Sequence, residues 1–422
     1  MNGLRWTAVL AAVAVTAAAI QAADVGGDPK ADTSALGTPK DNPGWFQWLG
    51  PNHDGISTEK GWSADFPEGK AKIDWKAELG LGFSSMTVRD GRVYTLGNTE
   101  GTETVWCLDA KKGQLVWKYT YSCPLGEHPG PRATPANDGK NVYTLSRTGQ
   151  FFCFDAAKGE VKWSKDLAKE FGVKAPVSGW GFACSPLLYD DWVIVDVGTV
   201  IAFQRATGEV VWKSEAYPVG FASPMPFVMG SDRRLAIFNS GGLVILNAAD
   251  GKERLRFPWK TRPDVNAVTP IVSGKTAFIS SGYGTGGALV DISGEEPKAV
   301  WQNKKMCNHF TTCMLIDGHL YGFNEATLTC MELATGEVKW TQAGLGKGSL
   351  MAADGKLIVI SESGELVIVE VNPKEYKPLA RAKVTTGTCW TPPVLADGRI
   401  YVRNDKGNLV CVDVSGQAKA AP

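Results

Sequence analysis

Six side chains suited to holding a ligand stand at matching places along this chain, in segments that lead into apolar strands. They are Arg132, Trp180, Asn266, His309, Lys347 and Trp390. Most of these segments also carry a Ser or Thr, often followed by Pro, which caps and starts the strand. Aromatic, amide and basic groups that converge would hold a flat or anionic ligand. A plainer alternative stays open, in which Trp180 and Trp390 fill a channel and His309 bonds a neighbouring backbone.

The sequence signals for a metal or phosphate site are weaker than those for the aromatic and basic ligand site. The His residues, at 53, 128, 309 and 319, lack the spacing of a zinc site, and no Cys-x-x-Cys-His string for haem is present. The Gly-rich string SGYGTGGALV at 281–290 joins two expected strands without the helix that follows a phosphate loop. No metal site is predicted.

Eight of the nine cysteines fall into groups by position. Cys107, Cys153, Cys330 and Cys411 each stand two residues before a turn carboxylate, so we expect them to be small core hydrophobes on equivalent strands. Cys307 and Cys313 share one hairpin region and can form a disulfide or stay reduced. Cys184 and Cys389 are expected at the channel mouth as free thiols.

A repeated unit must position these side chains. The string LDAKKGQLVW at 108–117 returns as FDAAKGEVKW at 154–163, FQRATGEVVW at 203–212 and MELATGEVKW at 331–340. In the first two copies Asp109 and Asp155 can accept hydrogen bonds from the turn backbone, and Gly113 and Gly159 can take a positive φ. The Trp that follows would bury one face of its blade against the next, as radially stacked sheets require.

A second signal gives the number of units. Turn residues followed by an alternating apolar strand recur eight times, from DGRVYTL at 90 to DGRIYV at 397. The spacing of about 40 to 50 residues leaves room for four short strands and no helix. The last unit ends at VCVDVSGQAKAAP without an outer strand, while KIDWKAELG at 72–80 is an unmatched strand with Trp75. We therefore predict an all-β, eight-bladed β-propeller at 45–417, closed by its N-terminal strand, with a C-terminal tail at 418–422.

The N-terminus and the charge balance limit the location and the partners. Residues 1–23 have the n-region, apolar run and small residues of a signal peptide, which we favour over a membrane anchor, and 24–44 read as a flexible leader. A periplasmic or secreted protein with no stable membrane anchor is expected. Lys plus Arg equals Asp plus Glu at 44 each, so no basic field for nucleic acid exists.

On these repeats the chain resembles the PQQ-like (pyrroloquinoline quinone) β-propellers, whose units have the form Asp-x-x-Thr-Gly-x-x-x-Trp. The resemblance covers about residues 45 to 417, and WFQWLGPNHDGIS at 45–57 is similar to the lead-in of short exported propellers of this type. It implies the fold more strongly than an activity. The family includes quinoprotein alcohol dehydrogenases and a non-enzymatic propeller lipoprotein of the outer-membrane β-barrel assembly machinery.

A dehydrogenase of this family would need a carboxylate base and oxygen ligands for the Ca²⁺ that polarises the quinone. The segments that lead into the inner strands contain no Asp or Glu, so the candidates for catalysis are Asp264 and His309, with Glu127 nearby. The adjacent cysteine pair of the dehydrogenases is absent. We therefore predict an exported binding or scaffold module, with a protein partner on the blade surfaces or a small molecule at the channel mouth. The alternative is a PQQ-dependent dehydrogenase that uses PQQ with calcium to oxidise alcohols or sugars.

Overall fold

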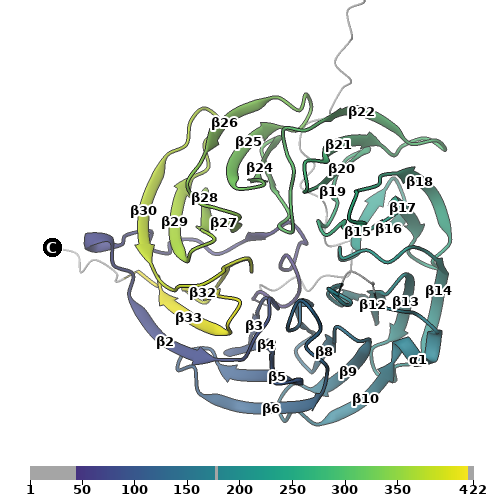
Figure 1. Ribbon diagram of the computed structural model, residues 1–422, viewed down its shortest axis with the longest axis horizontal. Coiled ribbons are helices and arrows are strands. Elements are labelled where there is room, and N and C mark those ends of the chain that lie inside the picture. The colour runs from purple at the N-terminus through teal and green to yellow at the C-terminus, as the bar shows by residue number, and fades with distance from the viewer. Residues whose placement is uncertain (1–43, 176–178, 417–422) are drawn as a thin grey trace, which may run out of the picture.

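The computed structural model describes residues 44–175 and 179–416. Eight sheets stand around a central channel like the blades of a propeller, as Figure 1 shows. The all-β, eight-bladed fold expected from the repeats is confirmed. The expected signal peptide at 1–23, all but the last residue of the leader at 24–44, and the tail at 418–422 lie outside the described residues.

Each blade has four antiparallel strands, and in blades 1 to 7 these run outwards from the channel in chain order. Blades 1 to 4 consist of β3 (Thr87–Arg89), β4 (Arg92–Thr99), β5 (Thr102–Asp109) and β6 (Leu115–Ser122); β7 (Ala136–Asn137), β8 (Asn141–Leu145), β9 (Gln150–Asp155) and β10 (Val161–Asp166); β11 (Leu187–Tyr189), β12 (Trp192–Asp196), β13 (Thr199–Gln204) and β14 (Val210–Ala216); and β15 (Met225–Met229), β16 (Asp232–Asn239), β17 (Gly242–Asn247) and β18 (Glu253–Pro258). A short helix, α1 (Leu167–Phe171), follows blade 2.

Blades 5 to 7 repeat the arrangement, and blade 8 joins the two ends of the propeller. Their strands are β19 (Ile271–Ser273), β20 (Thr276–Ser281), β21 (Gly286–Asp291) and β22 (Lys298–Asn303); β23 (Met314–Ile316), β24 (His319–Asn324), β25 (Thr327–Glu332) and β26 (Val338–Gln342); β27 (Ser349–Ala353), β28 (Lys356–Ile360), β29 (Glu365–Glu370) and β30 (Pro378–Lys383); and β31 (Val394–Ala396), β32 (Arg399–Arg403), β33 (Asn408–Asp413) and β2 (Ile73–Glu78). The two remaining elements are β1 (Ile56–Ser57), which pairs in parallel with β27, and a 3-10 turn, η2 (Pro67–Gly69).

The outer strand of blade 8 comes from the N-terminal side of the chain. In β2, Trp75 pairs with Cys411 of β33 in an antiparallel register. The predicted closure by the N-terminal strand is therefore confirmed. It removes the two free sheet edges that an open array would expose.

The recurring Asp-Gly turn joins the two inner strands of a blade. At Asp90 and Gly91 φ is 52° and 70°, so both central residues of this two-residue hairpin are left-handed, as a type I′ turn requires. Asp317 with Gly318, and Asp397 with Gly398, repeat this pair of positive φ values. Asp and Gly tolerate this backbone better than other residues, which explains why the signal recurs.

The Asp, Gly and Trp of the longer string act between neighbouring blades. The Oδ1 atom of Asp109 accepts the backbone N–H groups of Lys111 and Lys112 at 3.0 and 2.7 Å, as expected for the turn. A Cβ on Gly113 would lie 2.5 Å from the indole of Trp75 in the preceding blade. That indole donates its Nε1 hydrogen to the carbonyl of Ala110, 3.1 Å away. Glycine is thus required where the Trp of the previous blade covers the turn.

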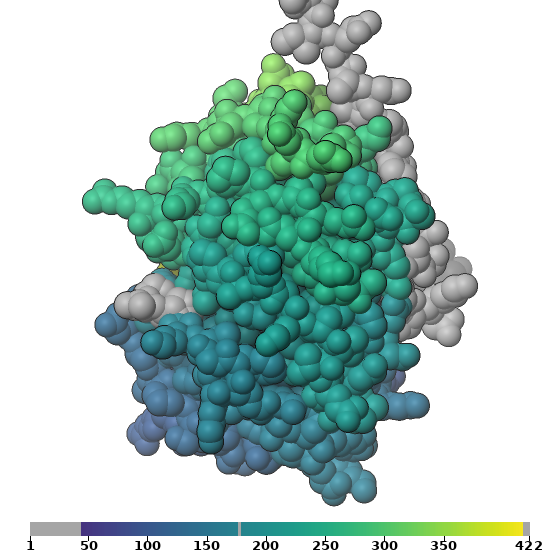
Figure 2. Space-filling model, turned by 90° about the vertical axis from the view of Figure 1, so that its right-hand side faces the viewer, coloured from purple at the N-terminus to yellow at the C-terminus, as the bar shows by residue number. Residues whose placement is uncertain are grey.

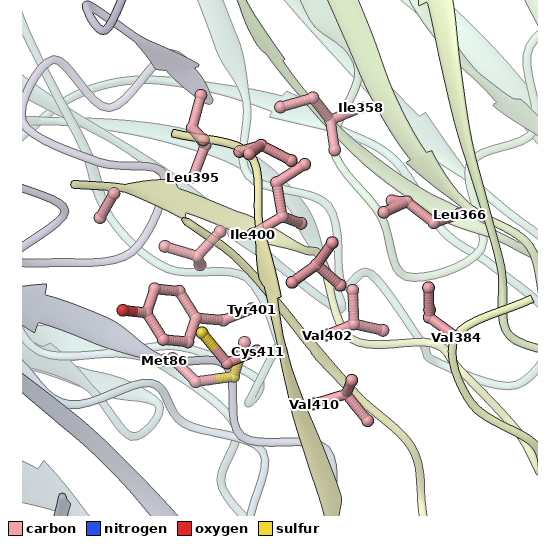
Figure 3. Close-up of a cluster of buried hydrophobic side chains, with 14 of the residues drawn as sticks. Met86, Ile358, Leu366, Val384, Leu395, Ile400, Tyr401, Val402, Val410 and Cys411 are labelled. Atoms are coloured by element: carbon pink, nitrogen blue, oxygen red, sulfur yellow. The ribbon is translucent and has the colours of Figure 1, made fainter. Parts of the chain in front are cut away.

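Apolar clusters fill the space between blades. The largest one joins blades 7, 8 and 1, and Figure 3 shows Ile358 and Leu366 of blade 7 facing Ile400 and Val402 of blade 8. Seen from its rim, the propeller passes from blue through teal to green, the order of the chain (Figure 2). Among the described residues, no helix is long and apolar enough to cross a membrane.

The cysteines follow the pattern expected for core residues. All nine are reduced and buried in the structure. Cys107, Cys153, Cys330 and Cys411 occupy the third strands of blades 1, 2, 6 and 8, which are equivalent positions. Cys307 and Cys313 are not joined. Cys184 and Cys389 are free, but they do not line the channel mouth as expected, because both are buried in apolar clusters between blades.

Candidate ligand site at the channel mouth

Hydroxyl groups in or beside the inner strands tie most neighbouring blades together around the channel. Ser84 donates to the carbonyl of Ala133 at 2.7 Å, and Ser349 donates to the carbonyl of Trp390 at 2.6 Å. Other links of this kind are Thr134 N–H to Ser185 Oγ, Ser185 N–H to Ser223 Oγ, Thr269 N–H to Thr312 Oγ1, Thr311 Oγ1–H to the carbonyl of Gly348, and Thr391 Oγ1–H to the carbonyl of Phe83. The repeated Ser or Thr therefore does more than start a strand, because its hydroxyl fixes the spacing between blades.

The segment 45–57 closes the channel at the end opposite the mouth. It passes from one inner strand to the next, with backbone bonds from Trp45 to Val88 and from Phe46 to Asn137, and then pairs with β27 through Ile56. Figure 1 shows this segment in purple across the centre of the ring. The indole of Trp48 donates to Thr269 Oγ1 at 3.0 Å and becomes part of the cavity wall. The channel is therefore a blind funnel with an aromatic floor.

A cavity of about 130 Å³ lies above this floor. Its wall is mainly aromatic and aliphatic, with a few polar groups, and every blade except blade 7 contributes to it. The lining residues are Trp48, Phe83, Arg132, Trp180, Ala183, Ser185, Phe221, Ser223, Val265, Ala267, Thr269, Tyr283, His309, Phe310, Trp390 and Pro392.

The aromatic rings of the cavity contact one another around one side of the mouth. Phe83 stacks on Trp390 with ring centroids 5.5 Å apart and an interplanar angle of 21°. Phe310 lies 4.9 Å from Trp390, and His309 lies 4.3 Å from Tyr283. Such contacts restrain the rings, so the wall is preorganised for a flat apolar group.

A hydrogen-bonded cluster at blades 6 and 7 supplies the acids of the site. His309 Nδ1 lies 2.9 Å from Glu325 Oε2, and Lys347 Nζ lies 3.6 Å from the same oxygen. Glu362 accepts the Trp390 Nε1 hydrogen at 2.9 Å and the backbone N–H of Lys347 at 3.2 Å. Both carboxylates are thus held in place by neighbouring donors.

The protonation of His309 follows from these neighbours. Burial lowers the pKa of His309 below its usual value and the Lys347 charge adds to this, while the bond to Glu325 opposes both. Burial alone would raise the pKa of Glu325, but its hydrogen bonds with His309 and with the backbone N–H of Gly284, together with the Lys347 charge, lower it. The imidazole is then neutral at neutral pH. Because the ionised carboxylate cannot donate, Nδ1 carries the hydrogen and Nε2 is the nitrogen able to accept a proton.

Cationic groups occupy the blade 2 side of the mouth. The Arg132 guanidinium lies 4.8 Å from the ring centre of Trp180 and 5.5 Å from that of Phe83. It donates to the carbonyls of Gly130 and Trp180, both at 3.0 Å. Burial, and then the nearby Arg147, lower the pKa of Arg132 to about 9, which leaves it charged at neutral pH. Within 44–175 and 179–416, neither arginine forms a salt bridge with a carboxylate.

The residues predicted from the sequence are partly brought together. Arg132, Trp180, His309 and Trp390 line the cavity, and the ammonium of Lys347 lies beside His309 at the rim. The amide of Asn266 does not reach the cavity, because it is fully buried and bonds the carbonyl of Asn239 at 2.7 Å and Ser281 Oγ at 2.6 Å. Its neighbours Val265 and Ala267 face the cavity instead.

The two acidic residues proposed from the sequence, Asp264 and Glu127, lie away from the cavity. Asp264 is exposed, in a turn with φ of 53°, and does not line the cavity wall. Glu127 is also exposed and lies against Gly179. Neither carboxylate therefore faces the aromatic wall.

Several residues of the site were missed in the sequence. Glu325, Glu362 and Tyr283 stand in or beside the hairpins between the second and third strands of their blades. These hairpins emerge at the same end of an antiparallel blade as the segments that lead into its first strand, so strand alternation would have found them. Phe83 and Phe310 stand next to the Ser and Thr of the inner strands and could have been recognised as mouth residues.

The polar groups of the cavity do not form an obvious cation site. No group of three or more His, Cys, Asp or Glu side chains able to hold a metal ion is found in the part of the chain that the structure describes. The carboxylate of Glu325 is engaged by His309 and Lys347, and Glu362 accepts a hydrogen bond from Trp390. The residues present therefore fit a planar anion better than a quinone held by Ca²⁺.

Known proteins share both the repeats and the ring. The family model described as outer membrane protein assembly factor BamB matches residues 102–342, more than half of the chain. The chain belongs to this family. A BamB of Shewanella oneidensis is 22% identical over 371 residues, which cover 74% of this chain and 92% of the relative.

Solved structures show the same fold in proteins of two kinds. BamB of Moraxella catarrhalis aligns with a TM-score of 0.60 at 16% identity, over 81% of this chain and 99% of that one. The quinohemoprotein alcohol dehydrogenase ADHIIG of Pseudomonas putida HK5 aligns with a TM-score of 0.63 at 14% identity, over 94% and 84%. At these identities the likeness establishes the PQQ-like propeller fold, and function has to be argued from the site.

Proposed function

We propose that this BamB-family chain is a periplasmic binding scaffold that acts in the assembly of outer-membrane proteins. The observation that carries the proposal is the family match over 102–342, which runs from β5 to the end of β26. The closed and plugged ring supports it, since the channel is no passage and the loops and rim remain as contact surfaces. A binding role suits a propeller whose strands are all used to close the ring.

The rim offers a surface for a protein partner. Exposed aliphatic side chains recur at the start of the outer strands, with Leu115 53% exposed in blade 1, Val210 45% in blade 3 and Val300 52% in blade 5. Val116 and Val211 stand beside two of them. Aliphatic groups repeated at one level of the rim favour protein contacts over solvation.

A genetic experiment tests the scaffold role. Deleting the gene in the native host should lower the amount of outer-membrane β-barrel proteins, and re-expression should restore it. A Val116→Glu, Val211→Glu variant should be exported and folded but restore less. Glu296→Gln, at an exposed polar site two residues before β22, changes a charge near the rim without altering an aliphatic side chain and should restore fully. Unchanged levels of barrel proteins after deletion would overturn the proposal.

The channel mouth is proposed as a ligand site of this scaffold. Arg132 and Trp180 supply a cation and a flat ring on the blade 2 side, and Trp390 supplies an aromatic wall from blade 8. His309 and Lys347 supply polar groups at the rim. Binding of small ring compounds, measured by ligand-observed NMR, tests this site.

A quinoprotein dehydrogenase is the second candidate. The observation that favours it is the His309–Glu325 pair, which presents a neutral imidazole nitrogen at an aromatic cavity. A positioned base of this kind is what alcohol oxidation requires. Its test is PQQ-dependent reduction of a dye by the purified chain.

A further inference from the structure

We propose that the mouth cavity binds a carboxylate carried on a single aromatic ring, the class of arenecarboxylates of which benzoate is the simplest member. The proposal rests on the ligand site at the channel mouth and names what that site takes.

The volume of the cavity sets the size of the ligand. It holds about 130 Å³, and an apolar protein cavity of about 150 Å³ accepts benzene. One six-membered ring therefore takes up most of this space, and a small substituent on the ring extends to the open mouth. PQQ has three fused rings and three carboxylates, so it would extend beyond this space into the open mouth.

The walls fit the two faces of one ring. Phe83 and Trp390, from blades 1 and 8, stack on each other and line the cavity. Phe221 and Val265 line it from blades 4 and 5, which stand opposite blades 8 and 1 in a closed ring of eight. A ring between these walls would exchange water contacts for aromatic and aliphatic ones on both faces.

The charge of the site selects an anion. Arg132 lines the cavity, is half-buried between two aromatic rings, and has carbonyl partners but no carboxylate partner among the described residues. A cation that is withdrawn from water without a counter-ion attracts a negative group strongly. Arg147 adds a second positive charge behind it, since its own bonds go to the carbonyls of His128 and Gly179.

Two hydroxyl groups on the same side can assist the arginine. Ser185 and Ser223 line the cavity from blades 3 and 4, and each Oγ accepts a backbone N–H from a neighbouring blade at 2.9 Å. Each hydroxyl therefore still has its own hydrogen to donate. A carboxylate can accept it, whereas an ammonium cannot.

The acidic side of the mouth gives the ligand a direction. Glu325 and Glu362 belong to blades 6 and 7, which lie opposite blades 2 and 3. Their charges repel a carboxylate and Arg132 attracts it, so both effects turn the carboxylate towards blade 2. The ring then lies against Trp390 and Phe310.

The experiment compares three probes of similar shape and different charge. Benzoate, benzyl alcohol and benzylamine are titrated into the purified full chain, and the dissociation constants are measured by ligand-observed NMR at neutral pH. We expect benzoate to bind about 10- to 100-fold more tightly than benzyl alcohol, as a hydrogen bond to a charged group implies, and benzylamine to bind most weakly. Arg132→Gln should remove the preference for benzoate and leave benzyl alcohol unchanged. Arg381→Gln, at an exposed site on β30, removes the same charge away from the mouth and should change neither.

The outcomes separate the ligand class from the site. Binding of benzyl alcohol or benzylamine at least as tight as that of benzoate would overturn the arenecarboxylate class and retain the mouth as a ligand site. Failure of all three probes to bind would overturn both. If Arg132→Gln does not fold, the comparison of the three probes on the unchanged chain still decides the class.

Discussion

Trp75 lies opposite Cys411 in the outer pair of strands of blade 8, although the two residues are separated by almost the whole propeller in sequence. The same indole donates to the carbonyl of Ala110 in blade 1 and is 8% exposed. One side chain thus joins the N-terminal strand, the last blade and the first.

Removing this side chain should weaken the ring at its closure. We expect Trp75→Ala to lower the free energy of unfolding by about 3–5 kcal/mol, as for other buried Trp truncations. Deleting residues 1–80 should open the ring, whereas deleting 24–44 should cost nothing. Urea unfolding measures each change, with Leu379→Ala at an exposed rim site as the control. Equal stability of the 1–80 deletion and the full chain would contradict closure by β2.

Substituting two glycines that share one backbone conformation separates the cost of backbone strain from the cost of side-chain crowding. Gly91 and Gly113 have φ of 70° and 68°, but an added Cβ meets nothing within 4 Å at Gly91 and lies 2.5 Å from the Trp75 ring at Gly113. Gly91→Ala should cost about 1–2 kcal/mol from the left-handed backbone alone. Gly113→Ala should cost about 1–3 kcal/mol more because of overpacking.

A double variant checks the origin of the difference. In a Trp75→Ala background the extra cost of Gly113→Ala should disappear, because the ring that crowds the new methyl group is gone. Urea denaturation of the four variants gives the coupling directly. A coupling of zero would show that the Trp–Gly contact does not explain the repeat.

The fold could be predicted because its information is local and recurs. Within ten residues, Asp109 and Gly113 form a turn and Trp117 makes an inter-blade contact, and the same pattern recurs along the chain. The closure could be predicted because the incomplete last unit and the fragment around Trp75 complement each other. The repeats do not predict the path of the irregular segment 45–57. Its place as the channel plug, with Trp48 as the floor, depends on contacts with several blades at once.

The site could be predicted only in part for a similar reason. Arg132, Trp180, His309 and Trp390 were found because they interrupt a regular pattern, and they do line one cavity. Asn266 interrupts it too, but an amide can satisfy buried backbone groups, and here it bonds the carbonyl of Asn239. Glu325 and Glu362 stand in ordinary polar turns, where nothing in one sequence separates a solvated acid from one that faces the mouth.

A buried acid in blade 1 should make stability depend on pH. Glu103 on β5 is fully buried and accepts a hydrogen bond from the Tyr121 hydroxyl. Burial raises the pKa of Glu103 from 4.5 to about 7, against the opposing effect of that bond. The folded state therefore holds the proton more tightly than the unfolded state. The stabilisation that this protonated carboxyl gives the fold is full below about pH 4.5 and is lost as pH rises to about 7.

Glu103→Gln isolates that contribution, because the amide keeps the shape and an acceptor for Tyr121 but does not ionise. The free energy of unfolding of this variant, relative to the original chain, should grow by up to about 3 kcal/mol between pH 4.5 and pH 8. Urea unfolding at these two pH values measures it, and Glu296→Gln at an exposed site is the control. An advantage that shrinks with rising pH would show that the carboxyl is held ionised.

The choice between scaffold and dehydrogenase can be tested by turnover. With PQQ, Ca²⁺ and an artificial electron acceptor, we expect no steady oxidation of primary alcohols or sugars. The neutral His309 supplies a base, but the cavity admits one ring, and its carboxylates are engaged by His309, Lys347 and Trp390 rather than free for a cation. The dehydrogenase ADHIIG of Pseudomonas putida HK5, assayed in parallel, confirms that the assay works. Steady PQQ-dependent dye reduction that is lost in His309→Ala or Asp264→Ala would replace the scaffold proposal with an enzymatic one. A catalytic base contributes about 10²–10⁴-fold to the rate of such a step, and a binding site alone would not show this loss.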